Sequence, residues 1–132
     1  MVDARLASQG SVDRFVLEFD EVVPPRWEVA YGDEPISAQC TAPQVTAGAF
    51  LNVYAYPSAG TDYYGNPPRA SYEGPKRLKS DTRVIREALF TCDFEADLTW
   101  ALALDRRLPF RVEVLESPPR LLIEVQISDE GA

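Results

Sequence analysis

Apolar and polar residues alternate at every second position in several short stretches of this 132-residue chain. In "RFVLEFD", Phe15, Leu17 and Phe19 would share one face of a strand, with polar residues on the other. "RWEVAYG" and "FLNVYAYP" repeat the pattern. A period near two is typical of strands that are buried on one face, so the chain is constrained to fold mainly as β-sheet.

Proline, glycine and aspartate separate these stretches, and eleven prolines favour short elements with sharp corners. We therefore predict an all-β chain, a β-sandwich of about seven to nine short and mostly antiparallel strands. Residues 81–91 could instead form a helix capped by Asp81, but the β-branched Val84 and Ile85 favour a strand. "DLTWALALD" also has helical propensity, and its alternation favours a strand.

One segment, residues 57–80, lacks the alternation and has four prolines, three glycines and three tyrosines. It is too long for a hairpin turn, and long ordered loops in compact domains are often functional. We predict one domain over residues 11–127, with an N-terminal tail at 1–10 and a C-terminal tail at 128–132.

Several kinds of chemistry are disfavoured. The chain has no histidine, which removes the common nucleophilic triads and the commonest transition-metal ligand, and it has no phosphate-binding glycine motif. Asp93, Glu95 and Asp97 could share a strand face and hold calcium or form an acid/base pair, but such runs are more often solvated. We expect that the protein is not an enzyme and that it binds no cofactor or metal. A net charge of −8 argues against nucleic acid and anionic membranes as partners, and no apolar run is long enough to span a membrane.

A basic island interrupts this acidic chain. Residues 69–86 contain six of the 13 basic residues and only two acidic ones, and tyrosines lie before and within the island. Aromatic rings beside cationic donors suit a carbohydrate or an anionic polymer, although the tyrosines could simply pack the loop onto the sandwich. The candidate binding residues are Tyr63, Tyr64, Arg69, Tyr72, Lys76 and Arg77.

The two cysteines, Cys40 and Cys92, are too far apart in sequence for a CxxC motif. They could form a disulfide in an exported protein, or remain two buried thiols. "MVDARLASQG" has no apolar centre of the kind found in signal peptides, so Met1 could be the start of a cytoplasmic protein or follow a removed leader.

Four stretches together give the chain a family resemblance over about residues 11–127. They are "DRFVLEFD", "YEGPKRL", "VIREALFTCDFEADLTWALALD" and "PFRVEVLESPPRLLIEV". In their order and spacing the chain resembles the AMIN-like domains of actinobacterial exported proteins and lipoproteins. The two cysteines are not hallmarks of that family, and Ala96 stands where these domains favour glycine.

The resemblance implies a β-sandwich related to the AMIN domain, which localises envelope proteins through peptidoglycan, and it brings no catalytic residues. We therefore expect a non-catalytic envelope-binding module that recognises peptidoglycan or another anionic wall polymer outside the cytoplasm. The alternative is a protein-interaction or assembly domain that uses exposed strand edges and the 57–80 loop to contact an envelope protein.

Two arginines, Arg14 and Arg120, are expected to be structural. Arg120 follows two prolines at the start of an apolar strand. We expect its stem to lie over the core and its guanidinium to pair with Glu18 or Glu124, so that it fastens a corner of the fold.

Overall fold

The computed structural model describes residues 1–20, 24–62, 64 and 66–128, and it consists of strands joined by turns and loops. The strands are β1 (Asp3–Gln9), β2 (Val12–Glu18), β3 (Arg26–Gly32), β4 (Ala49–Tyr56), β5 (Thr61–Asp62), β6 (Arg69–Ala70), β7 (Arg77–Leu78), β8 (Ile85–Phe94), β9 (Asp97–Leu104), β10 (Phe110–Leu115) and β11 (Arg120–Gln126). The all-β prediction is confirmed. The described strands outnumber the prediction because the 57–80 segment contributes three strands of two residues each.

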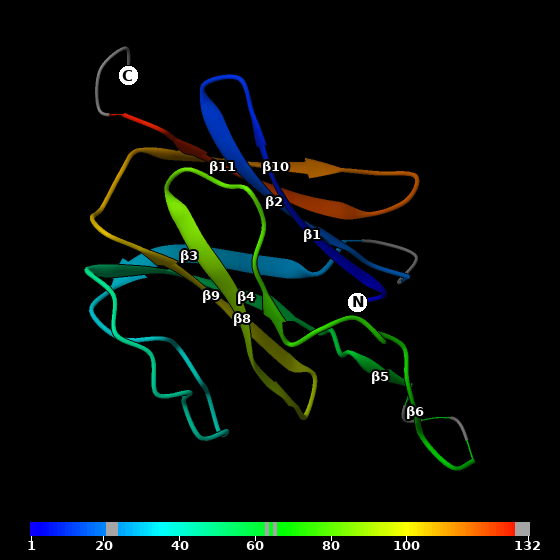
Figure 1. The fold of residues 1–132 in the computed structure, drawn as a ribbon. Coiled ribbons are helices and arrows are strands. Elements are labelled where there is room, and N and C mark those ends of the chain that lie inside the picture. The colour runs from blue at the N-terminus through cyan, green and yellow to red at the C-terminus, as the bar shows by residue number, and fades with distance from the viewer. Residues whose placement is uncertain (21–23, 63, 65, 129–132) are drawn as a thin grey trace.

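Two antiparallel sheets form the layers of a sandwich (Figure 1). The four-stranded sheet has the order β1-β2-β11-β10, and the five-stranded sheet has the order β3-β4-β9-β8-β7. A separate ribbon of β5 and β6 lies at one end of the molecule. Residues 81–91 contain the start of β8 and "DLTWALAL" is β9, so both segments form strands, as predicted, and not helices.

The core lies between the two large sheets and is formed by the alternating positions seen in the sequence. Trp100 of β9 is fully buried at its centre. Its ring stacks on Phe90 with 4.9 Å between ring centroids, and Phe15 and Tyr72 contact it at 5.2 and 5.9 Å. Aromatic rings bury large areas, so this cluster is expected to dominate the apolar stabilisation.

The predicted N-terminal tail at residues 1–10 is wrong. Residues Asp3–Gln9 are β1, which pairs with β2 along its whole length. Ala4 and Leu6 face the core, and the side chain of Met1 is buried and accepts a hydrogen bond from the indole of Trp100. The alternation is present in "DARLASQ", but small alanines make it weak.

A long connection, residues 33–48, covers part of the outer face of the five-stranded sheet. Val45 and Ala47 pack on a small apolar cluster formed by Phe50, Leu89, Ala101 and Ala103. The side chain of Asn52 holds the beginning of the connection, because it accepts from the amide of residue 36 and donates to the carbonyl of residue 34. A disulfide between Cys40 and Cys92 joins this connection to β8.

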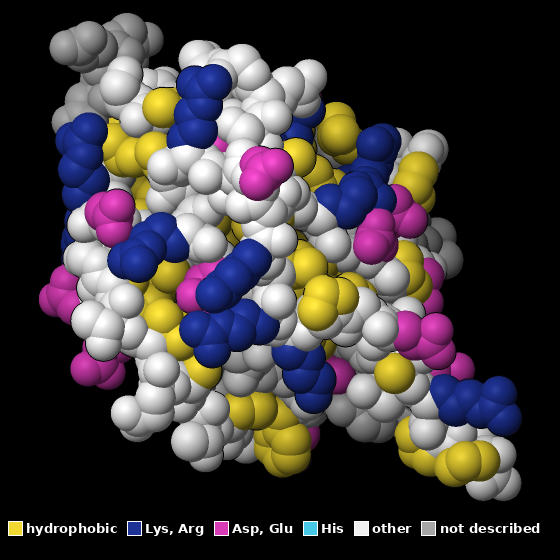
Figure 2. All heavy atoms as spheres, viewed as in Figure 1, with side chains coloured by type: hydrophobic (Ala, Val, Ile, Leu, Met, Phe, Trp, Pro, Cys, Tyr) yellow, Lys and Arg dark blue, Asp and Glu magenta, His cyan; other side chains and the backbone are white. Residues whose placement is uncertain are grey.

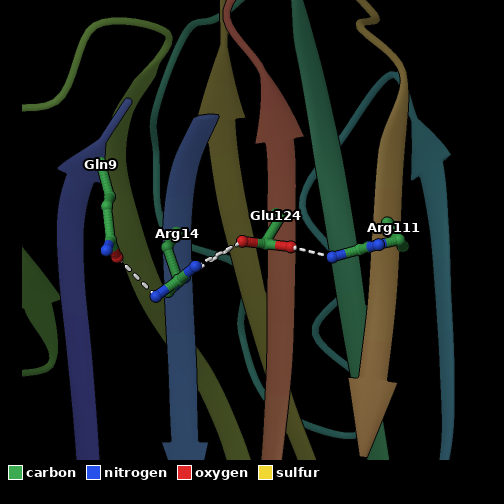
Figure 3. Close-up of polar contacts among 4 residues, drawn as sticks. All are labelled: Gln9, Arg14, Arg111 and Glu124. Carbon is green, nitrogen blue, oxygen red and sulfur yellow. Dashed lines mark hydrogen bonds and ion pairs between the residues drawn. The ribbon is translucent and has the colours of Figure 1, made fainter. Parts of the chain in front are cut away.

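A row of charged side chains crosses the outer face of the four-stranded sheet (Figure 3). Glu124 of β11 lies between Arg14 of β2 and Arg111 of β10, each directly opposite it in register. The Nη2 of Arg14 is 2.6 Å from Oε2 of Glu124, and the Nη2 of Arg111 is 2.7 Å from Oε1. Gln9 accepts from Arg14, which extends the row to β1. Arg14 is thus a structural residue that ties three strands together.

These two arginines lower the pKa of the Glu124 carboxyl, Arg14 contributing most. A lowered pKa in the folded state stabilises the fold above the unfolded pKa of about 4.3, and this contribution is lost as the pH falls through the folded pKa. We expect Glu124→Gln to lower the free energy of unfolding by about 2 kcal/mol at pH 7. The deficit should shrink in urea unfolding at pH 3, and Glu113→Gln, an exposed control on the same face, should change stability little at either pH.

Arg120 does not make the predicted ion pair. Its Nε donates to the carbonyl of Pro118, 3.2 Å away within its own turn. Glu18 lies opposite Arg120 in register, but the guanidinium of Arg5 is 3.6 Å from the Glu18 carboxylate. Arg120 alternates with the inward Leu121, so its stem lies on the outer face of the sheet and not over the core. It holds the corner through the backbone of the turn.

Candidate functional site

The ribbon of β5 and β6 projects from the sandwich at the end where β4 finishes (Figure 1). In its register Thr61 pairs with Ala70, and Asp62 with Arg69. Thr61 is also tied to the body of the molecule, because its hydroxyl donates to Oδ2 of Asp93 at 2.9 Å. The prolines and glycines around this ribbon explain its shortness, since both residue types interrupt the hydrogen-bond ladder.

A cleft of about 570 Å³ lies between the ribbon and the sandwich. Its walls come from the ribbon, from the chain that leaves β4, and from the turn between β8 and β9. The residues that line it are Asp20, Pro57, Ser58, Ala59, Thr61, Asp62, Tyr64, Arg69, Ala70, Ser71 and Ala96. This volume lies within the usual range of small-ligand sites, roughly 300–1,000 Å³.

The cleft combines one aromatic ring with charged and hydroxyl groups. The side chain of Tyr64 is fully exposed, and its amide donates to the carboxylate of Asp62 at 3.0 Å. Within the described residues no carboxylate pairs with the guanidinium of Arg69, although Asp62 lies opposite it in register. An exposed ring and a guanidinium that forms no ion pair within the described residues therefore both line this cleft.

Only some of the sequence candidates meet in this cleft. Tyr64 and Arg69 line it, whereas Tyr63 lies outside the described residues. Lys76 lines a second cavity of about 320 Å³, beside the disulfide and Asp93. Arg77 pairs with Glu87 of the neighbouring strand, so its charge is neutralised locally.

Tyr72 belongs to the core and not to the cleft. Its side chain is 7% exposed and contacts the rings of Phe90 and Trp100 at 5.8 and 5.9 Å between centroids. Its hydroxyl donates to the carbonyl of Pro75, and burial raises its pKa. The ring is thus not accessible for stacking on a ligand, which corresponds to the packing interpretation of the loop tyrosines.

The basic island is spread out in the structure. Arg86 pairs with Asp105 and Arg77 with Glu87, while Arg69 lines the cleft and Lys76 lines the second cavity. Figure 2 shows the same pattern, with basic side chains scattered over the face in view and several of them beside acidic ones. The charged side chains that line the cleft are Arg69, Asp20 and Asp62.

The three alternate carboxylates do not form a site. Asp93 accepts from Thr61, and Asp97 accepts from the hydroxyl of Tyr54. Glu95 and Ala96 form the turn between β8 and β9, both with left-handed backbone (φ 52° and 67°), which explains a preference for glycine at position 96. The described part of the chain contains no group of three or more residues suited to hold a metal ion.

One buried acid was missed by the sequence reasoning. Asp13 is fully buried, and its Oδ2 accepts hydrogen bonds from the amides of Arg83, Val84 and Ile85 at 2.9, 2.6 and 2.9 Å. Asp13 alternates in phase with Phe15, so the sequence did carry a signal that this acid points inward. Its partners are backbone amides, which gives it a structural role between the two sheets.

The family comparison agrees with this architecture. A family model described as the AMIN-like domain matches residues 1–127, including β1, and confirms the resemblance drawn from the sequence. No curated protein and no solved structure matches the chain. In the described residues we find no helix that is long and apolar enough to cross a membrane.

Proposed function

The chain belongs to the AMIN-like domain family, and from this premise we propose that it is a binding module that recognises peptidoglycan or another anionic wall polymer through the cleft beside β5 and β6. Family membership indicates a cell-wall-related binding module of a kind that is generally non-catalytic and typically extracytoplasmic. We propose the use of this cleft as the binding site, the ligand, and the roles of the residues named below.

The observation that carries the proposal is that Tyr64 and Arg69 both line the cleft. A sugar ring can stack on the exposed tyrosine, because the ring face is flat and apolar. The guanidinium can then bind a carboxylate or phosphate of the polymer with two parallel hydrogen bonds. Hydroxyl and carboxylate groups of the lining, such as Asp62, can accept hydrogen bonds from sugar hydroxyls.

The net charge of −8 does not oppose this assignment. Charges are screened over about 8 Å at physiological ionic strength, so the guanidinium in the cleft acts on a bound anion more strongly than distant acids do. Because Asp20 and Asp62 line the cleft together with Arg69, we expect the affinity for an anionic polymer to be modest. Binding through many repeats of a polymer would compensate for weak individual contacts.

The disulfide supports the proposed location outside the cytoplasm. Cys40 and Cys92 are bridged, and disulfides persist mainly in oxidising compartments.

Sedimentation with purified cell wall tests the proposed cleft. We expect Tyr64→Ala and Arg69→Ala each to raise the dissociation constant about tenfold, because each removes one stacking or charge-assisted contact. Trp27→Ala is the matched control, since Trp27 is an exposed aromatic residue of the edge strand β3 that does not line the cleft. Thermal unfolding should show that all three variants remain folded. Equal retention of Tyr64→Ala, Arg69→Ala and wild type would exclude the cleft as the binding site.

A further inference from the structure

Exposed aromatic side chains gather near the cleft. Five large apolar side chains among the described residues are more than about a third exposed, namely Trp27, Tyr56, Tyr64, Phe94 and Val114. Tyr64 lines the cleft, and Tyr56 and Phe94 lie next to its walls, because Pro57 and Ala96 are lining residues. The amide of Ser58 donates to the carbonyl of Ala96 at 2.9 Å, which holds these two walls together.

Tyr56 and Phe94 belong to a row that crosses the outer face of the five-stranded sheet. Arg26 of β3 lies opposite Tyr56 of β4, and Phe94 of β8 lies opposite Asp97 of β9. Ala55 pairs with Leu98, so the next residues along these strands, Tyr56 and Asp97, are also neighbours. Since neighbouring strands are about 4.8 Å apart, the backbones of Tyr56 and Phe94 are two strand spacings apart, roughly 10 Å.

The row is held in place by specific contacts. The guanidinium of Arg26 lies over the ring of Tyr56, 5.2 Å from its centroid. Tyr54, two residues before Tyr56 on the same face, donates its hydroxyl to Asp97, and this hydrogen bond raises the pKa of Tyr54. A ring held by such a contact, as that of Tyr56 is, loses little conformational freedom when a ligand binds, which favours recognition.

We propose that this row is a second subsite for the ligand of the cleft, so that the protein binds an extended glycan chain of several sugars and not a single sugar. This inference rests on the proposed function. A chain that leaves the cleft past Pro57 and Ala96 would pass onto the outer face, where Phe94 offers a ring for stacking. Arg26 can donate to its hydroxyl or acidic groups, and Asp97 can accept from its hydroxyls.

The composition of the row favours a glycan over a protein partner. Each ring has a charged neighbour, because Arg26 and Asp97 lie on either side of Tyr56 and Asp97 lies opposite Phe94. At the centres of protein interfaces acidic residues such as Asp97 are depleted, and the apolar fraction is higher than on the rest of the surface. A sugar chain presents apolar ring faces and hydroxyl groups in close succession, which matches separate rings interleaved with charges. In Figure 1 the β8–β9 turn lies on the same lower side of the molecule as β5 and β6, as one chain requires.

Sized peptidoglycan fragments test the inference by calorimetric titration of the whole protein. We expect fragments of six or more sugars to bind at least tenfold more tightly than a disaccharide. Phe94→Ala and Tyr56→Ala should each weaken binding of the long fragment about tenfold and leave disaccharide binding unchanged. Tyr64→Ala should weaken both. Trp27→Ala should weaken neither, because Trp27 alternates with Arg26 and so lies on the opposite face of β3 from the row.

The outcomes separate the two proposals. If long and short fragments bind equally, or if Phe94→Ala and Tyr56→Ala bind the long fragment as wild type does, the second subsite is overturned while the cleft assignment stands. If Tyr64→Ala binds both fragments normally, the cleft assignment fails. If wild type binds neither fragment, both proposals are overturned for peptidoglycan glycan. The midpoint of thermal unfolding is measured for each variant. A midpoint equal to that of wild type shows that weaker binding does not result from unfolding.

Discussion

Asp13→Ala is expected to lower the free energy of unfolding by about 3–5 kcal/mol, because three backbone amides lose the carboxylate that accepts their hydrogen bonds. The carboxylate is fully buried in β2 and accepts three consecutive backbone hydrogen bonds from residues 83–85. Alanine would leave these amides without their acceptor, and the start of β8 would lose its attachment to the four-stranded sheet. Domains of this size are stable by only about 5–15 kcal/mol, so this loss is a large fraction.

Urea unfolding followed by tryptophan fluorescence measures this effect. Asp13→Asn is the informative companion, because an amide oxygen can still accept the hydrogen bonds but carries no charge. We expect it to be less destabilised than alanine. Asp81→Ala, which removes an exposed acid close to the same segment, should change stability by less than about 0.5 kcal/mol. An Asp13→Ala protein within 1 kcal/mol of wild type, roughly the size of one ordinary hydrogen bond, would contradict the structural role.

Asp13 also illustrates how far the sequence leads. The period of two identified β2, β4, β9 and β11 and their inward residues, because burial on one face imposes that pattern. The same phase placed an acid inside the core, and a buried acid must have partners. Its partners lie about seventy positions away and are backbone amides, which no side-chain pattern reveals.

The candidate site was only partly predictable for a related reason. Residues 57–80 have no alternation, so nothing in the sequence assigns their side chains to a face. Tyr64 and Tyr72 are both tyrosines of this irregular segment. Tyr64 is nevertheless fully exposed, whereas Tyr72 packs in the cluster around Trp100. By contrast, Tyr54 and Tyr56 alternate with core residues along the regular strand β4, so the alternation alone indicated that they point outward.

The charged contacts were the least predictable part. Glu18 and Arg120 are directly opposite each other, as the alternation of both strands allows, but the guanidinium of Arg5 approaches Glu18 from the other side. Which cation reaches a given carboxylate depends on the order of the strands in the sheet. That order places β1 beside β2, and it is a property of the tertiary fold that local pattern does not contain.

Removing the disulfide is the second change with a large expected effect. We expect the Cys40→Ser/Cys92→Ser double variant to lose about 3–4 kcal/mol, because the bridge closes a loop with a sequence separation of 52 residues and so restricts the unfolded chain. In the folded state, the double variant should also be less ordered locally, within the 33–48 connection. Packing of Val45 and Ala47, the contacts of Asn52 and the ion pair between Asp33 and Arg107 would then remain to hold the 33–48 connection.

Two measurements distinguish this bridge from a pair of buried thiols. In denaturant without reductant, wild type should show no titratable thiol, and two thiols would contradict the bridge. Reductant should lower the midpoint of urea unfolding of wild type toward that of the double variant and leave the variant unchanged. Hydrogen exchange should increase most within residues 33–48, while the amides of β9, which pair with strands on both sides, should keep their protection relative to global unfolding. If exchange in the double variant instead increases no more within residues 33–48 than elsewhere, the bridge acts only on the unfolded state. The simplest form of the loop-entropy account requires this result.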